Sequence, residues 1–339
     1  MPTGSDRVAS SSVATASPLL SLPTMADDLQ RIEGALRAAV RTSDDYLTEM
    51  ATHLIQAGGK RLRPVLAAAS AAAGGAPVTD GVIQGGVAVE LVQVGSLYHD
   101  DVIDEAETRR GTISVNARWG NHRAILAGDF LLARASEIAA SLGAEVAGLL
   151  GATIGRLVEG QIGELQSQYR PERTVEQYLA SITGKTASLF SAASRIGGIV
   201  AGLPRAAIDQ LTTYGLAYGM VFQIVDDVLD LTATDAELGK PSGHDLVEGV
   251  YTLPVILTLQ AGGAVAGELA DLLGRPIEGA ALDKALAIVR SNEGLHEAIG
   301  AARVWADRAS AAVASFGTEP AAVALAAAAH HLIDVLPTR

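Results

Sequence analysis

The sequence contains no cysteine among its 339 residues. Disulfides, thiolate metal sites and cysteine nucleophiles are therefore excluded, and the composition fits a reducing, cytoplasmic compartment. No stretch approaches the roughly 18 uninterrupted apolar residues of a membrane-spanning helix. The first residues also lack the basic start and apolar core of a signal peptide, so none is predicted.

Basic residues are scarce, with 25 Lys and Arg against 38 Asp and Glu, for a net charge of −13. A chain this acidic is a poor general nucleic-acid binder, and no nucleic-acid partner is expected. An anionic substrate would need a local cluster of cations or a bound metal ion.

Aromatic residues make up only 4% of the chain, whereas Ala and Gly are abundant. Alanine-rich stretches with apolar residues at i, i+3 and i+4 predict close-packed helices, and runs of alternating β-branched residues are few. The predicted fold is therefore an all-α, single-domain helical bundle. Helices are expected near residues 27–56, 64–73, 79–106, 115–141, 144–169, 174–201, 205–231, 252–261, 264–273, 280–290, 295–315 and 319–334.

Two segments are predicted to be irregular. Residues 1–26, rich in Ser, Thr and Ala, are predicted to be a disordered tail, which leaves residues 27–339 as the folded domain. The segment from Thr232 to Gly249 is rich in Gly, Asp and Thr, and we interpret it as a mobile loop that can close over a site.

The strongest motif is a repeated DDxxD sequence, and each copy ends a predicted apolar helix. Because residues four apart share a helix face, each copy directs two or three carboxylates to one place. Clustered carboxylates repel one another and oppose the dipole at a helix C-terminus, so a cation must offset them. One copy alone would be as well explained by an acidic helix end facing solvent, but two copies favour a site. The six residues are Asp100, Asp101, Asp104, Asp226, Asp227 and Asp230.

Oxygen ligands without His or Cys favour a hard cation, with Mg²⁺ the usual choice when phosphate oxygens complete its shell. Cations for an anionic ligand are found in Gly58-Gly59-Lys60-Arg61-Leu62-Arg63 and in Arg109-Arg110-Gly111. Solvated loops or local ion pairs with Glu105 or Glu107 are the alternatives. Gly184-Lys185-Thr186 resembles the end of a nucleotide P-loop but lacks its first glycine, so we reject that interpretation.

Five segments in this order, GGKRLRP, HDDVIDEAETRRG, GKT, FQIVDDVLD and GKPSGHDL, resemble the trans-type prenyl diphosphate synthase family, and its long-chain members in particular. The resemblance implies a helical domain around a deep central cavity, in which the two aspartate motifs face each other. It implies a homodimer, with small faces such as Gly151 to Gly155 available for helix packing. It also allows peripheral membrane contact for release of an apolar product.

The resemblance implies a role for each matching residue. The six aspartates bind about three Mg²⁺ ions that hold an allylic diphosphate. Gln161 and Glu164 match residues beside the metal-bound waters. Further contacts to the allylic diphosphate match Arg109, Lys185, Thr186, Gln223 and Lys240. The isopentenyl diphosphate site matches Lys60, Arg63, Gln93 and Arg110.

Two positions depart from the family pattern. Many long-chain members have His where this chain has Gln93, and many members have Lys where it has Val250. The implied mechanism is ionisation of the allylic C–O bond, with Mg²⁺, Arg109, Lys185 and Lys240 stabilising the leaving diphosphate. The double bond of isopentenyl diphosphate then captures the cation, and the released diphosphate takes the proton.

The resemblance also implies a product length, because in this family the helix before the first motif forms the cavity wall and short-chain members carry bulky aromatics there. Each helical turn of 5.4 Å is close to one isoprene unit, so small residues at these positions predict a product longer than about twenty carbons. Ser96 and Val92 lie one and two turns before Asp100, and Gly95 is their neighbour. These residues are expected to leave the upper part of the cavity open. The alternative is that Gly95 and Ser96 only allow close helix packing.

Three other functions are weighed against this one. A class I terpene cyclase would normally lack the second DDxxD motif and the isopentenyl site, and would line its cavity with aromatics. A catalytically silent subunit of a heteromeric synthase would be expected to lose one aspartate cluster, yet both are complete. A helical carrier of apolar ligands would need neither cluster.

Overall fold

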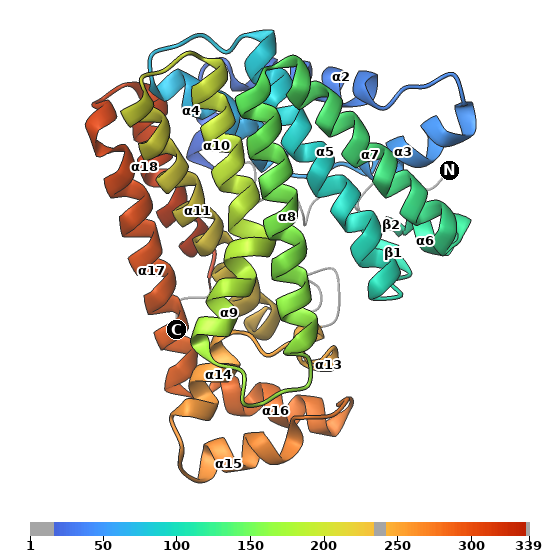
Figure 1. Cartoon of the computed structure of the whole chain (residues 1–339). Coiled ribbons are helices and arrows are strands. Elements are labelled where there is room, and N and C mark those ends of the chain that lie inside the picture. The colour runs from blue at the N-terminus through green and yellow to red at the C-terminus, as the bar shows by residue number, and fades with distance from the viewer. Residues whose placement is uncertain (1–16, 234–241, 337–339) are drawn as a thin grey trace, which may run out of the picture.

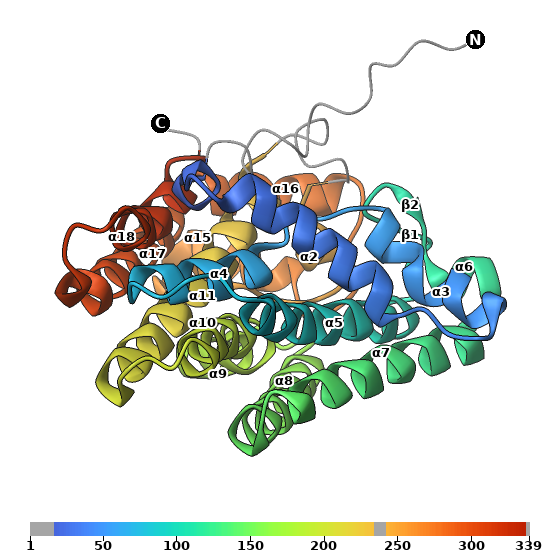
Figure 2. The ribbon, with the colours of Figure 1, turned by 90° about the horizontal axis from the view of Figure 1, so that it is seen from above.

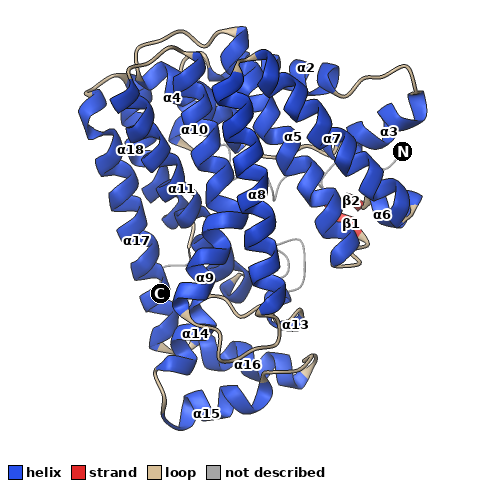
Figure 3. Ribbon diagram, viewed as in Figure 1, coloured by secondary structure: helices blue, strands red, loops and turns tan. Residues whose placement is uncertain are grey.

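The computed structural model describes residues 17–233 and 242–336. Within these residues the fold is almost entirely helical, and the only strands form one short antiparallel hairpin (Figure 3). The predicted all-α class is confirmed. No helix in the same ranges combines the length and the apolar composition needed to cross a membrane.

The long helices pack side by side in a bundle (Figure 1). Viewed from above, α2 and α4 lie on one side of α5 and α10, and α7 and α8 lie on the other (Figure 2). The bundle is built from α2 (Met25–Ala39), α4 (Leu62–Ala73), α5 (Asp80–Ile103), α7 (Asn121–Ser141), α8 (Ala144–Gln166), α10 (Ser188–Val200), α11 (Arg205–Thr232), α17 (Glu293–Val313) and α18 (Pro320–Ile333).

Shorter elements connect and cover these helices. They are the 3₁₀ helices η1 (Pro18–Ser21) and η3 (Ala314–Phe316), the π-helix η2 (Thr183–Ala187), the strands β1 (Thr108–Arg109) and β2 (Thr112–Ile113), and the helices α3 (Asp45–Gln56), α6 (Val115–Trp119), α9 (Val175–Ile182), α13 (His244–Val247), α14 (Leu253–Gln260), α15 (Gly263–Leu272) and α16 (Ala280–Arg290).

Three predicted helices are each divided in the structure. The prediction of one continuous helix at 27–56 is wrong. The Asp44 carboxylate accepts the N–H groups of Tyr46 and Leu47, and α3 therefore begins as a separate helix. The helix expected at 115–141 breaks at Gly120, whose φ is +87°. The helix expected at 174–201 contains the π-helix η2 between α9 and α10.

The predicted tail boundary at residue 26 is too late. Residues 18–21 form η1, α2 begins at Met25, and both Leu19 and Met25 are fully buried in the core. Residues 1–16 lie outside the described residues, as do residues 234–241 of the predicted closing loop. The rest of that loop contains α13 and is attached to α11 through a 2.7 Å hydrogen bond from the Gly243 N–H to the Asp230 carbonyl.

Helix α8 approaches the π-helix η2 backbone to backbone. A Cβ atom at Gly160 would overlap the backbone nitrogen of Lys185 and lie 2.7 Å from the Ser181 carbonyl oxygen. A Cβ atom at Gly184 would lie 2.5 Å from the Arg156 carbonyl oxygen. Only glycine allows this approach, which brings Glu164 of α8 next to Lys185.

We predict that Gly160→Ala destabilises the fold by roughly 1–3 kcal/mol, the usual cost of overpacking. Gly148→Ala is the matched control on the same exposed helix, because a Cβ atom there has nothing within 4 Å. The control should be neutral or stabilising by about 0.5–1 kcal/mol through helix propensity. Urea unfolding of both variants measures the difference, and equal unfolding free energies would contradict the prediction.

Candidate active site

The first aspartate motif forms the C-terminal end of α5. Asp100 and Asp101 lie in its last turn, and Asp104 is the C-cap residue. The hairpin β1–β2 folds back so that Arg109 forms a double contact with one oxygen of the fully buried Asp101, at 2.6 Å from both Nε and Nη2. The other carboxylate oxygen of Asp101 is buried without a hydrogen-bond partner.

The three carboxylates of this motif share an environment that disfavours their charge. Burial raises the pKa of Asp100 and of Asp101, although nearby cations oppose the shift. Burial, together with the charges of Glu248 and Asp100, raises the pKa of Asp104 to about 6. As the four-residue spacing predicts, Asp100 and Asp104 are electrostatic neighbours, whereas Asp101 turns toward Arg109.

The second motif lies in the last two turns of α11. The buried Asp227 accepts a 2.6 Å hydrogen bond from the Tyr178 hydroxyl and a 2.8 Å bond from the Gln223 amide. The Gln223 amide oxygen in turn accepts a 2.7 Å bond from the Thr186 hydroxyl. Asp230 is buried and its carboxylate accepts the N–H of Asp245, whereas Asp226 is exposed.

Burial raises the pKa of Asp227 to about 7, because the hydrogen bonds from Tyr178 and Gln223 only partly offset the desolvation of its carboxylate. The charges of Asp226 and Glu164 raise it further. A carboxyl with this pKa is only partly charged at neutral pH, and a cation placed beside it would favour the carboxylate.

Lys185 lies between the two motifs. Its ammonium donates a 2.5 Å hydrogen bond to Glu164 on α8. Burial alone would lower the pKa of Lys185, but the charges of Glu164 and Asp100 outweigh burial and raise it, so the side chain is a cation. Glu164, predicted only as a neighbour of metal-bound water, is thus the direct partner of Lys185 in this structure.

Both motifs reach the same cavity. Its volume is about 120 Å³, and it lies between α5, α8, α9 and α11. The residues that line it include Asp104 from the first motif and Asp227 from the second, and from the helices between them Gln161, Glu164, Tyr178, Lys185 and Gln223. The aspartates, separated by more than a hundred positions in the sequence, therefore surround one polar space.

The donor set of this cavity fits a hard cation. The buried amide oxygen of Gln161 in its lining has no hydrogen-bond partner, and the acidic residues of the lining offer carboxylate oxygens, with no His or Cys among them. No group of three or more acidic or histidine side chains in residues 17–233 and 242–336 is close enough to hold a metal ion by itself. Mg²⁺ is commonly bound by one or two carboxylates together with phosphate oxygens and water.

The basic segment before α4 divides into three different environments. Lys60 is exposed. Arg61 is buried in ion pairs with Glu33, at 2.6 Å, and with Glu90, at 3.2 Å. The guanidinium of Arg63 lies 4.4 Å from the centre of the Phe190 ring. Arg61 therefore has a structural role, whereas Lys60 and Arg63 keep their cationic groups outside ion pairs among the described residues.

Arg110 lies beside this segment. It donates hydrogen bonds to the carbonyl oxygens of Gly58, at 2.6 Å, and Leu54, at 3.1 Å. Burial lowers the pKa of Arg63 to about 10, and the charge of Arg110 lowers it further while Glu90 opposes the shift. Gln93, predicted for the same site, is half-buried on α5, two turns before Asp100.

Gly95 was predicted to leave the upper part of the cavity open, and this prediction is wrong, because Gly95 faces α7. A Cβ atom at Gly95 would lie 3.1 Å from the Gly128 carbonyl oxygen and 3.4 Å from Leu131, so α7 fills this space. The alternative of close helix packing is correct at this position. Ser96 is buried and its hydroxyl donates to the Gln93 carbonyl at 3.0 Å, and Val92 is buried one turn further from the motif.

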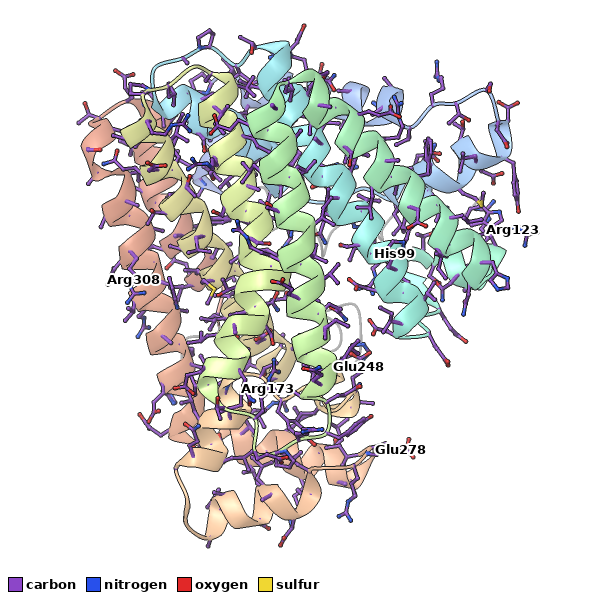
Figure 4. All side chains as sticks on the ribbon, in the orientation of Figure 1. His99, Arg123, Arg173, Glu248, Glu278 and Arg308 are labelled. Atoms are coloured by element: carbon purple, nitrogen blue, oxygen red, sulfur yellow. The ribbon has the colours of Figure 1, made fainter. Side chains whose placement is uncertain are left out.

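Sequence reasoning missed two lining residues. Tyr178 was not predicted, although the Thr174–Gln177 capping box that begins α9 fixes its position next to Asp227. Arg173, buried in the loop before α9, was also missed, and no motif marks it (Figure 4). Lys240, predicted to contact diphosphate, lies outside the described residues.

Known proteins resemble this chain in both sequence and structure. The chain matches the polyprenyl synthetase family over residues 44–289. It is 37% identical over 305 residues to nonaprenyl diphosphate synthase of Mycobacterium tuberculosis, covering 90% of this chain and 91% of that protein. It is 39% identical over 236 residues to heptaprenyl diphosphate synthase component 2 of Geobacillus stearothermophilus, covering 69% and 73%.

Solved structures agree with the sequence comparison. A decaprenyl diphosphate synthase from Rhodobacter capsulatus superposes with a TM-score of 0.87 at 32% identity, covering 94% of this chain and 99% of that chain. A geranylgeranyl pyrophosphate synthase from Corynebacterium glutamicum, complexed with calcium and isoprenyl diphosphate, superposes with a TM-score of 0.82 at 35% identity, covering 93% and 98%. The resemblance predicted from the five segments is confirmed, and the chain belongs to the polyprenyl synthetase family.

Proposed function

We propose that this protein is a Mg²⁺-dependent trans-prenyltransferase. It condenses isopentenyl diphosphate with an allylic diphosphate and releases a polyprenyl diphosphate longer than about twenty carbons. The observation that carries the proposal is the single cavity lined by Asp104, Asp227 and Lys185, which brings both aspartate motifs and a cation together. The nonaprenyl and octaprenyl diphosphate synthases among its relatives support the long product.

The six aspartates would hold Mg²⁺, and Mg²⁺ supplies positive charge to the diphosphate as its C–O bond breaks. Lys185 is already cationic beside Asp100 and Asp104, and it stabilises the leaving diphosphate once it exchanges Glu164 for phosphate oxygens. The Thr186–Gln223–Asp227 hydrogen-bond chain fixes the second motif while this happens. The released diphosphate takes the proton from the condensed product, so no protein nucleophile is needed.

Isopentenyl diphosphate binds at the basic residues Lys60, Arg63 and Arg110. Lys60, Arg63 and Arg110 supply three cations there without a metal ion, and Gln93 adds an amide on the same helix that carries the first motif. A diphosphate held by these cations has its alkene directed toward the end of α5. The near-attack distance for such a condensation is about 3–3.5 Å.

We also propose a cytoplasmic homodimer that pairs through α7 and α8. Five of the exposed large apolar side chains lie on these two helices, which favours a protein partner there. They are Ile125, Leu126, Val158, Ile162 and Leu165. Sedimentation equilibrium measures the mass, and a monomer at micromolar concentration would contradict this part of the proposal.

The function is tested by incubating the pure protein with labelled isopentenyl diphosphate, an allylic primer and Mg²⁺. We expect chain extension that EDTA abolishes. Asp101→Asn and Asp227→Asn should each lower turnover by about 10²–10³, the scale of losing one transition-state electrostatic contact. Cyclisation of the primer without extension would favour a terpene cyclase, and no reaction with any primer would favour a silent subunit or a carrier.

The raised pKa of Asp227 predicts how the metal-free protein responds to pH. The folded carboxyl titrates at about 7, above its ordinary value of 3.8, so proton binding stabilises the fold. That stabilisation is complete below about pH 4 and is lost as the pH rises through about 7. Asp227→Asn carries no charge, so in EDTA its melting temperature should exceed that of the wild type near pH 8, and the gap should close near pH 4.

Calorimetry over this pH range measures the effect. Adding Mg²⁺ with inorganic diphosphate should reverse the order near pH 8, because a bound cation stabilises the Asp227 carboxylate and not the amide. A variant that is no more stable than the wild type in EDTA near pH 8 would show that burial of this charge costs nothing.

The product length depends on the residues below the first motif. Ser96→Phe places a ring one turn below Asp100 and should shorten the main product, while the rate of the first condensation changes less. Gly95→Phe is a poor test, because its ring would meet α7. Product chromatography decides the point. A wild type that stops at about twenty carbons, or an unchanged product in Ser96→Phe, would mean that the tail does not follow this face of α5.

A further inference from the structure

Arg173 is a buried cation with unused donors. Only 3% of the residue is exposed, and its Nη1 donates a 3.0 Å hydrogen bond to the Tyr251 carbonyl. The guanidinium lies 5.6 Å from the centre of the Tyr178 ring. Its Nε and Nη2 atoms are buried and have no hydrogen-bond partner, and no carboxylate in the described part of the chain forms an ion pair with it.

Buried donors of a charged group normally find acceptors, so this pair requires an explanation. Nε and Nη2 form one edge of the guanidinium, and this edge binds two oxygens of a single carboxylate or phosphate side by side. Such a pair of parallel donors suits an oxyanion better than it suits a water molecule.

The position of Arg173 identifies the oxyanion. It lines the same 120 Å³ cavity as Lys185, Gln223, Asp104 and Asp227. Burial lowers the pKa of Arg173, and the nearby charges of Glu164, Asp227 and Asp245 oppose this shift only in part. Glu164 already accepts a hydrogen bond from Lys185, and Asp227 accepts one from Tyr178. An anion that enters this acidic cavity needs bound cations to offset the repulsion from these carboxylates, and a diphosphate with metal ions meets that condition.

We propose that Arg173 is a further diphosphate-binding residue, which holds two oxygens of the allylic diphosphate from the α9 side of the cavity. The assignment rests on the proposed function and extends its binding site by a residue outside the aspartate, GKT and GGKRLRP motifs. Arg173 and Lys185 then approach the same diphosphate from the two ends of α9, while the aspartates bind it through Mg²⁺.

Two other roles are compatible with part of this geometry. Arg173 also lines a larger groove of about 940 Å³ between α8 and α9, where an anion would meet Arg170 and Arg156 instead. Alternatively, its contact with Tyr178 serves only to position the hydroxyl that donates to Asp227. Arg170 lines the groove but not the cavity, which makes it the matched control.

The experiment combines calorimetric binding of inorganic diphosphate with Mg²⁺ and steady-state kinetics with both substrates. Arg173→Gln should weaken diphosphate binding and raise the KM for the allylic substrate by about 10- to 100-fold, the size of charge-assisted contacts. The KM for isopentenyl diphosphate should change by less than about twofold, since that site is separate. Arg173→Lys should recover part of the loss, and Arg170→Gln should match the wild type.

Each contrary outcome overturns the assignment in a different way. Loss of diphosphate binding in Arg170→Gln would place the anion in the outer groove. Unchanged diphosphate affinity in Arg173→Gln, with turnover lowered as far as in Tyr178→Phe, would leave Arg173 as a positioning residue. Diphosphate binding is measured without turnover, so a wild type that binds diphosphate through Arg173 but extends no primer would contradict the proposed function alone.

Discussion

The structure depends on holding acidic side chains from two distant segments around one small, poorly solvated space. Desolvation, together with the charges of Glu248 and Asp100, raises the pKa of Asp104 to about 6, and burial raises that of Asp227 to about 7, so both carboxylates are unfavourable without added cations. Lys185 relieves only part of this repulsion, because Glu164 already uses its ammonium. A ligand that carries positive charge into the cavity would therefore stabilise the folded protein.

The helices fix these groups by contacts that leave little freedom. Gly160 and Gly184 bring α8 against η2, and the π-helix directs Lys185 between the motifs. Hydrogen bonds from Tyr178 and Gln223 hold Asp227, while Arg109 holds Asp101. Under the proposed function, the carboxylates that would hold the metal ions are thus already oriented, so little reorganisation is needed when negative charge develops on the leaving diphosphate.

Local patterns predicted the helical class, both aspartate motifs and the shared face of Asp100 and Asp104, since each follows from residue spacing along one helix. The predictions that failed, and the site residues that were missed, depend on packing between helices. Helix α5 is apolar around its whole circumference, so the sequence does not reveal that Gly95 faces α7 rather than the cavity. Tyr178 and Arg173 reach the site only because α9 folds beside α11, and no spacing rule marks such a contact.

The three cations of the basic segment show why charge must be judged after packing. Arg61 forms ion pairs with Glu33 and Glu90, so Lys60 and Arg63, together with Arg110, are the cations that can bind a ligand. Under the proposed function, these basic residues hold a diphosphate directly, whereas the aspartates hold one through metal ions. This difference in sign then helps to sort the two substrates, because a diphosphate without metal ions is attracted by the basic residues and repelled by the aspartates.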